Sequence, residues 1–250
     1  MRQNTVKKSL LRGKPVIGAE VILGSPLASE ALSRLGFDFV QVDTQHGSWG
    51  VETAMSAIWS IALAQAVPIV RVQQNDFFAI GGLLDRGALG IVVPMVEAVK
   101  EAERAVRAVR YPPQGSRSWS PFGAFPHGPE YEDQANNEIL LLIQIETALG
   151  ASSAEQIMAT EGIDGCWIGP YDLAKSMGVA FGSEQHEQAI SRVLEACRSI
   201  GKAPGIWADG ESAERRLRQG FLYVTAGSDN AFMTTEAGNT LSRLRNLLGD

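Results

Sequence analysis

Eight short apolar segments, each followed by a longer segment of helical period, constrain this 250-residue chain more than any other feature. Runs rich in Val, Ile and Leu that alternate with crossover helices are typical of parallel strands. The predicted strands are Val16–Leu23, Phe37–Asp43, Pro68–Val72, Ala88–Val96, Ile139–Glu146, Gly165–Ile168, Ala203–Ala208 and Leu222–Ala226. This pattern predicts one catalytic (β/α)8 TIM barrel over residues 1–250, in preference to a doubly wound open sheet.

Helix signals and one irregular segment complete the predicted organisation. Ser25 followed by Pro26 predicts the start of the helix after the first strand, and Gly36 its end. Gly87 is expected to stop the helix before the fourth strand. After the helix of Glu97–Arg110, the stretch YPPQGSRSWSPFGAFPHGPEYED is rich in Pro, Gly and aromatic residues and has no clear period. We predict that it forms a long loop over the site.

Charge and cysteine content exclude several classes of function. With 22 Lys and Arg against 28 Asp and Glu, the formal charge is -6, which does not favour nucleic acid or a membrane surface as partner. Cys166 and Cys197 form no CxxC or metal-ligand spacing, so neither a disulfide framework nor a structural zinc is expected. The amino terminus lacks the apolar stretch of a secretory signal, and no apolar run reaches membrane-spanning length. We therefore expect a cytoplasmic protein that acts on small molecules.

Two carboxylates fall where a barrel carries its catalytic groups, at the carboxyl ends of strands. Glu146 ends an apolar strand, and the period of two places Gln144 on the same face. Asp172 follows the next strand, where the chain turns at Gly169–Pro170. The alternatives are a salt bridge to an Arg for Glu146 and a first-turn helix acid for Asp172. Together the two carboxylates predict a site for a hard divalent cation whose other ligands are water and substrate oxygens.

One arginine and three histidines are the other candidate functional residues. Arg71 ends the third predicted strand, where a buried guanidinium must meet an anion, either a ligand or a protein carboxylate. Asp43 and His46 are close enough for the carboxylate to orient the imidazole for proton transfer, although His46 could also be a plain turn residue. His186 is expected on the solvated surface, and His127 in the long loop is expected away from the site.

Six segments together resemble the HpcH/HpaI aldolase family of the phosphoenolpyruvate/pyruvate barrel superfamily. They are FDFVQVDTQHG, PIVRV, LLDRGALGIVVPMV, RYPPQGSRS, LLIQIET and GIDGCWIGPYDLAKSMG, and the resemblance spans nearly the whole chain. It implies a class II aldolase that cleaves or forms the bond between a pyruvate-type 2-oxo acid and an aldehyde, with Mg²⁺, Mn²⁺ or Co²⁺ as cofactor.

The resemblance also implies roles for individual residues. Glu146 and Asp172 would be the metal ligands, and Arg71 would contact the 2-oxo oxygen and stabilise an enolate. Asp43 and His46 would form a catalytic dyad that moves the proton of the acceptor-derived hydroxyl. Substrate contacts are expected from Arg71, Gln144, Gly169, Pro170, Tyr171 and Asp172.

The implied assembly is a homohexamer, a trimer of dimers that exchange their C-terminal helices, with Asp85 reaching a neighbouring subunit's site. Two residues depart from the family pattern. Gln45 stands in place of the glutamate common in the DxEH motif, and Glu20 stands where many relatives carry tryptophan. Both lie near the expected acceptor end, so the aldehyde and the preferred 2-oxo acid stay open.

Other functions were weighed against this one. Schiff-base chemistry is disfavoured because none of the six lysines ends a predicted strand. A lyase or hydrolase of the same superfamily that acts on acyl-CoA or phosphonate substrates stays open, as does a non-catalytic protein that binds 2-oxo acids. Activity on pyruvate with a simple aldehyde, and exchange of the C3 protons of pyruvate, separate these alternatives.

Overall fold

Eight parallel strands close into a barrel in the computed structural model, which describes residues 1–248 apart from the side chains of residues 123 and 124. The strands are β1 (Val16–Val21), β2 (Phe39–Asp43), β3 (Val67–Arg71), β4 (Gly90–Val93), β5 (Leu140–Ile145), β6 (Gly165–Ile168), β7 (Gly205–Trp207) and β8 (Tyr223–Ser228). Each strand pairs with the next, and β8 pairs with β1. The predicted (β/α)8 TIM barrel is confirmed.

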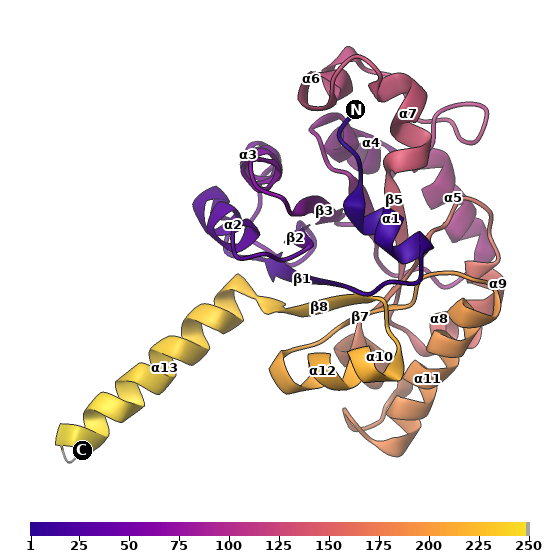
Figure 1. The fold of residues 1–250 in the computed structure, drawn as a ribbon. Helices are drawn as coiled ribbons and strands as arrows, with labels where there is room; N and C mark the ends of the chain where they lie inside the picture. The colour runs from indigo at the N-terminus through magenta and orange to yellow at the C-terminus, as the bar shows by residue number, and fades with distance from the viewer. Residues whose placement is uncertain (249–250) are drawn as a thin grey trace.

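Helices alternate with the strands and surround them (Figure 1). They are α1 (Thr5–Leu11), α2 (Pro26–Ser33), α3 (Val51–Ala62), α4 (Phe77–Asp85), α5 (Val99–Val109), the 3₁₀ turn η1 (Pro121–Gly123), α6 (Ala124–His127), α7 (Tyr131–Glu138), α8 (Ala148–Ser152), α9 (Ala154–Met158), α10 (Pro170–Met177), α11 (Glu184–Ser199), α12 (Gly210–Gln219) and α13 (Asp229–Leu248). As predicted, Ser25 caps α2 by accepting a hydrogen bond from the Ala28 amide at 3.2 Å. Gly87 follows α4 with a φ of 103°, a left-handed conformation that favours glycine.

Most predicted strands are longer than the observed ones. Only β6 has the predicted bounds, and β4 differs most, because Ala88–Val96 was predicted. Pro94 has no amide hydrogen to donate, and Met95 has a φ of 57°, so the chain leaves the sheet after Val93. Val96 is still buried, which explains why the apolar run is longer than the strand.

Two buried clusters of apolar side chains form, one inside the barrel and one between the barrel and its helices. Successive residues of a strand point to opposite faces, and a closed barrel turns one of these faces inward. Phe39, Leu142 and Trp167 belong to the inner cluster.

Helix α1 closes the amino end of the barrel. Its Val6 and Leu10 belong to the inner cluster. Two hydrogen bonds fasten this region to the starts of strands: Asn4 Nδ2 donates to the Leu89 carbonyl at 2.8 Å, and Lys7 Nζ donates to the Ile139 carbonyl at 2.9 Å. The interior is therefore accessible from the carboxyl end.

The long segment between α5 and β5 lies away from the carboxyl end, so the prediction that it covers the site is wrong for this chain. Tyr131 donates a hydrogen bond to the Leu84 carbonyl at 3.4 Å, and Arg117 pairs with Asp85 at 2.6 Å. Both acceptors lie at the end of α4, which is the amino end of the barrel. A connection from a helix to the next strand must return the chain to that end. His127 is buried there, away from the site as expected.

Helix α13 projects from the barrel as an extended rod, at the lower left of Figure 1. The Asp229 carboxylate accepts hydrogen bonds from the amides of Ile22 and Leu23 at 2.9 and 3.2 Å, and Phe232 stacks near Phe37 with ring centroids 6.3 Å apart. Beyond these contacts, its apolar side chains, including that of Leu244, are exposed.

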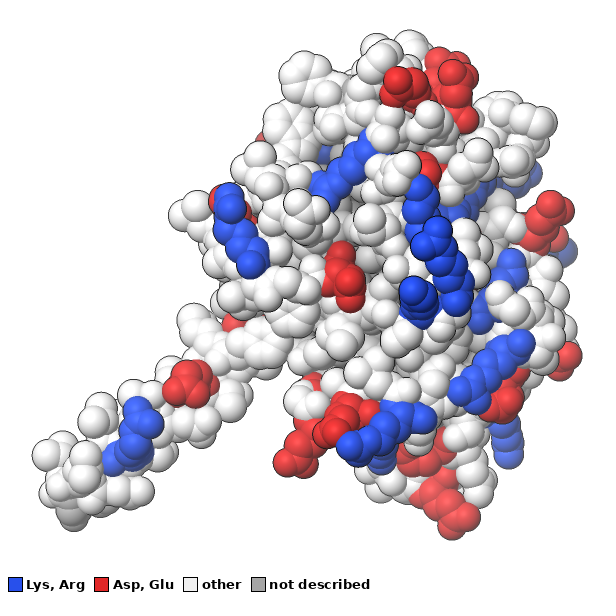
Figure 2. Space-filling view, viewed as in Figure 1, with Lys and Arg blue, Asp and Glu red and all other residues white. Residues whose placement is uncertain are grey.

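Two observations concern the surface. Within residues 1–248, no helix combines the length and hydropathy needed to cross a bilayer. On the face drawn in Figure 2, Lys and Arg side chains are interspersed with Asp and Glu.

Candidate active site at the carboxyl end of the barrel

Polar side chains point inward at the carboxyl ends of several strands, above the apolar inner cluster. The strand register pairs Glu20 with Gln41, and Asp43 with Arg71. Paired residues of parallel neighbours face the same side, so these four side chains line one inner wall. Gln144 of β5 faces the same interior. Predicted site residues from β2, β3 and β5 are thus brought to one end of the barrel.

Arg71 is the cation of this wall. Its Nε and Nη2 donate to the two carboxylate oxygens of Asp43 at 2.8 and 2.5 Å, and Nη2 lies 3.6 Å from Glu20 Oε1. The guanidinium also lies over the Trp167 ring at 5.1 Å. Burial disfavours the cation, but the hydrogen bonds to Asp43 and the charges of Glu20 and Asp43 outweigh this and raise the pKa of Arg71. Its Nη1 makes no hydrogen bond to any residue described, so this nitrogen can bind a ligand oxygen.

Asp43 contacts His46 through the main chain. Besides the Arg71 fork, its Oδ1 accepts hydrogen bonds from the amides of Gln45 and His46 at 3.0 and 3.3 Å. The His46 side chain is exposed, and it makes no hydrogen bond with Asp43 among residues 1–248. Asp43 therefore fixes the turn that carries His46 and the position of Arg71, while the predicted carboxylate–imidazole contact is not formed in this structure.

Glu146 is buried just beyond β5 and is held by neutral donors. The Met95 amide donates to its Oε1 at 2.8 Å, and Gln144 Nε2 donates to its Oε2. Burial raises the pKa of Glu146 to about 7, and the charge of Asp172 adds to the shift. No basic group lies within salt-bridge distance of Glu146 in the described chain. The structure therefore does not show the salt bridge to an arginine that was the alternative for Glu146.

Asp172 reaches the same rim from the first turn of α10. It is exposed, and its charge acts on Glu146. At the intervening Gly169, an added Cβ would lie 2.9 Å from Glu146 Oε2 and 3.0 Å from Gln144 Nε2, so a larger residue there would displace these two side chains. The charge of Asp172 thus reaches Glu146, and the role of the two carboxylates as metal ligands stays a prediction.

The residues present fit a hard divalent cation. Glu146 and Asp172 offer carboxylate oxygens, and Gln144 Oε1 is buried with no hydrogen-bond partner in the described chain. No cluster of three or more His, Cys, Asp or Glu suited to a metal occurs within residues 1–248. The cation would therefore take its remaining ligands from water or substrate, as Mg²⁺ commonly does.

His186 supports the turn that precedes Asp172. The sequence analysis missed this role. It is 0% exposed, so its predicted place on the solvated surface is wrong. The Gly182 amide donates to Nδ1 at 3.0 Å, so Nε2 must carry the hydrogen that is donated to the Pro170 carbonyl at 2.8 Å. Helical spacing could have revealed that His186 is buried, because His186 begins a stripe of buried residues that Ile190 continues.

Glu20 is a second buried carboxylate of the interior, 6% exposed. Gln41 Nε2 donates to its Oε1 at 3.1 Å. Burial raises the pKa of Glu20 to about 7; Arg71 opposes the shift, and Asp43 adds to it. The sequence singled out Glu20 as a departure from the family pattern but did not show that it faces Arg71.

An α/β barrel with carboxylates gathered at the carboxyl ends of its strands defines the class as barrel enzymes that work at this end. The chain belongs to the HpcH/HpaI aldolase/citrate lyase family, whose profile matches residues 21–235. The family predicted from the sequence is confirmed.

Individual relatives agree with this assignment. A 4-hydroxy-2-oxo-heptane-1,7-dioate aldolase of Shigella flexneri is 37% identical over 252 residues, which cover 98% of this chain and 94% of the relative. The crystal structure of a family member from Burkholderia cenocepacia J2315 has a TM-score of 0.91 at 31% identity, covering 97% of this chain and 99% of that one. That of the citrate synthase SbnG has a TM-score of 0.88 at 28% identity, covering 99% and 100%.

Glu20→Gln should remove a pH-dependent loss of stability. The folded protein binds the Glu20 proton more tightly than the unfolded chain, because the pKa is about 7 rather than the ordinary 4.5. As pH rises from about 5 to about 8, the free energy of unfolding of the wild type should therefore fall relative to that of the variant, by roughly 2 to 3 kcal/mol. Urea unfolding of both proteins across this range measures the difference. A difference that does not change with pH would contradict the assignment.

Proposed function

We propose that this protein is a divalent-metal-dependent aldolase, an aldehyde-lyase that cleaves or forms the bond between a pyruvate-type 2-oxo acid and an aldehyde. The observation that carries the proposal is the buried carboxylate of Glu146. It is influenced by the charge of Asp172, has no basic partner within residues 1–248 and shares the barrel mouth with Arg71. The name of the Shigella flexneri relative supports the same reaction.

Glu146 and Asp172 would hold the cation, Mg²⁺, Mn²⁺ or Co²⁺. When bound, it would polarise the carbonyl of a chelated 2-oxo acid and so acidify C3. Gln144 fixes Glu146, and the turn of Gly169, Pro170 and Tyr171 together with Asp172 would contact the substrate.

Arg71 would stabilise negative charge on the 2-oxo oxygen. Its Nε and Nη2 are held by Asp43, which leaves Nη1 to donate to the substrate. Because Asp43 locks the guanidinium in place, little reorganisation is needed when the charge develops.

His46 would move the proton to or from the hydroxyl derived from the aldehyde. Its imidazole is exposed at the rim, where it can act directly or through water. Asp43 would position it by fixing the turn through the amides of Gln45 and His46.

We propose that the protein assembles as a homo-oligomer, specifically a hexamer built from dimers that exchange α13. Leu241, Leu244 and Leu248 form one exposed stripe of α13, which a second copy would cover. Asp85 pairs with Arg117 within the same chain, and a role in a neighbouring subunit's site stays a prediction. A cytoplasmic location also stays a prediction; Cys166 and Cys197 are both free thiols.

Leu244→Asp should weaken this assembly, because a charge would replace an apolar side chain at the covered stripe. We expect a smaller species than the wild type in size-exclusion chromatography with light scattering. Asn239→Asp adds the same charge to the opposite face of α13 and should leave the mass unchanged. A wild-type monomer would refute the proposal.

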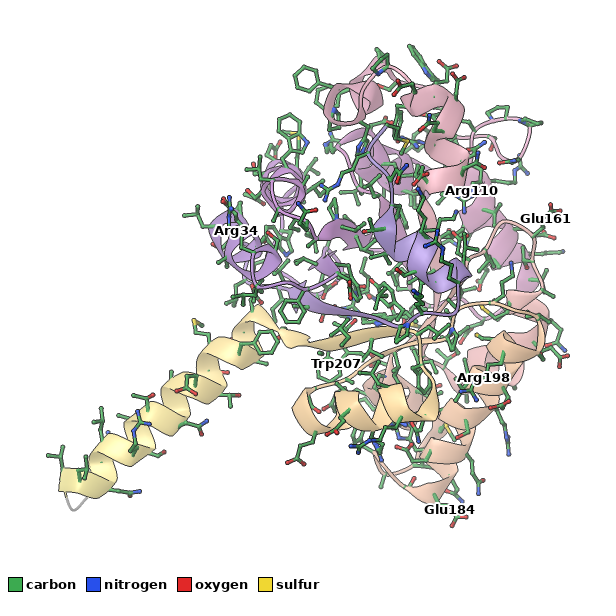
Figure 3. The ribbon with its side chains drawn as sticks, in the orientation of Figure 1. Arg34, Arg110, Glu161, Glu184, Arg198 and Trp207 are labelled. Atoms are coloured by element: carbon green, nitrogen blue, oxygen red, sulfur yellow. The ribbon has the colours of Figure 1, made fainter. Side chains whose placement is uncertain are left out.

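Removal of divalent metal should abolish aldol cleavage, and Mg²⁺, Mn²⁺ or Co²⁺ should restore it. Glu146→Gln and Asp172→Asn should each weaken metal binding by at least the 10- to 100-fold typical of outer-shell losses, measured by calorimetry. Glu161→Gln is the control, because this exposed residue lies on the outer surface of the barrel, as labelled in Figure 3. Asp164 is unsuitable as a control, since it pairs with Lys7 and Arg110 at 3.1 Å each. Full activity in a metal-free preparation would rule out the proposed cofactor.

His46→Ala should retain affinity for metal and pyruvate but lose turnover. In D₂O, the wild-type protein with metal should exchange the methyl protons of pyruvate, which NMR detects. The variant should lose exchange and cleavage by a factor on the order of 10²–10⁴, as is typical of general acid–base catalysis. Wild-type rates in the variant would place the base elsewhere. No exchange by the wild type with any 2-oxo acid would favour a binding protein instead.

A further inference from the structure

The inner wall formed by β1 faces the proposed metal ligand across the barrel. The closed order β1 to β8 places β1 and β5 on opposite sides. Glu20 of β1 and Glu146 at the end of β5 both point into the interior, and the charge of each acts on Arg71. A molecule held at Glu146 that extends across the mouth therefore meets Glu20.

The Glu20 carboxylate is held in place and keeps open acceptor positions. Tyr223 donates a hydrogen bond to Gln41 Oε1 at 3.0 Å, which turns the Gln41 amide nitrogen toward Glu20 Oε1. Arg71 Nη2 lies 3.6 Å from the same oxygen. Trp207 is the other side-chain donor that acts on this carboxylate, and a carboxylate has about four acceptor positions, so positions stay open on Glu20. A fixed carboxylate with an open acceptor position suits a ligand that donates, such as a hydroxyl group.

Charge also discriminates among ligands at this wall. Arg71 is the only Lys or Arg within the eight strands, and Asp43 already takes two of its donors. Glu20 and Asp43 are both buried beside this one cation, whereas Glu146 would be offset by the proposed metal ion. A ligand carboxylate near Glu20 would add a third negative charge in a poorly solvated interior, where the strands supply no cation besides Arg71, whose free Nη1 would contact the 2-oxo oxygen.

Aromatic side chains continue the wall toward solvent. Trp207 at the end of β7, labelled in Figure 3, lies close enough to Glu20 to stabilise its charged form. Tyr171 packs edge-on against Trp207 at 5.5 Å and stacks on Phe181 at 4.4 Å. Tyr171 and Phe181 are 49% and 52% exposed at the mouth. Such a surface packs against the carbon chain of a ligand whose hydroxyl groups turn toward Glu20.

We propose that Glu20 and the aromatic residues Trp207, Tyr171 and Phe181 form an acceptor site that selects hydroxylated aldehydes and disfavours aldehydes with a terminal carboxylate. This inference rests on the proposed aldolase function. The name of the Shigella flexneri relative describes a substrate with a second carboxylate, at C7, in the part released as aldehyde when the C3–C4 bond breaks. The present chain would differ from that relative in its acceptor.

The test compares four aldehydes with pyruvate and metal: glyceraldehyde against propanal, and 4-oxobutanoate against butanal. Each pair has the same number of carbon atoms, so the ratio of kcat/KM values isolates the hydroxyl or the carboxylate. At pH 8, where Glu20 is largely ionised, wild type should favour glyceraldehyde over propanal and butanal over 4-oxobutanoate. Glu20→Gln should shift both ratios by about tenfold or more in the opposite direction, as loss of a charged hydrogen-bond acceptor predicts. Glu161→Gln should shift neither.

Glu20→Asp covers the case in which Glu20→Gln does not fold. It keeps the charge but withdraws the acceptor, so it should still reject 4-oxobutanoate while losing the preference for glyceraldehyde. Ratios that are the same in wild type and in the folded Glu20 variants, or a wild type that prefers 4-oxobutanoate, would overturn the inference while leaving the aldolase proposal intact. A wild type that neither exchanges pyruvate protons nor condenses any of the four aldehydes would instead refute the proposed function.

Discussion

The guanidinium of Arg71 is the interaction on which the mouth of the barrel depends. Asp43 and Glu20 lie in an apolar interior where an unpaired carboxylate is costly, and Arg71 is the only strand residue that can offset their charge. Its own desolvation is offset in turn by these carboxylates and by the Trp167 ring. Removing either side of the pair would leave a buried charge, so the inner wall of the candidate site and the local fold are stabilised by the same contacts.

The fold was predictable because a parallel barrel imposes two periods on the sequence. Strand residues must be apolar on both faces deep in the barrel, and the apolar residues of the crossover helices must recur every 3.6 residues. These two periods located all eight strands. Their ends were not predictable to the residue, since Val96 is buried in a loop just as it would be in a strand. The segment before β5 was misplaced because its composition indicates irregular structure without indicating which end of the barrel it occupies.

The position of the predicted site residues in the barrel was predictable, and their contacts were less so. Arg71, Asp43, Gln144, Glu146 and Asp172 meet at one rim because each lies at or just beyond a strand end, which the sequence shows directly. Which groups pair is decided by side-chain geometry: Asp43 takes Arg71 and leaves the imidazole of His46 exposed. His186 was misjudged because its charged neighbours concealed that its own face of α11 is buried.

Helix α1 closes the amino end of the barrel with the side chains of Val6 and Leu10. Tyr171 and Phe181 are exposed at the opposite, carboxyl end. Reactants and products therefore enter and leave at the same end of the barrel. A molecule bound against Tyr171 and Phe181 would obstruct both movements, because α1 leaves no route through the amino end.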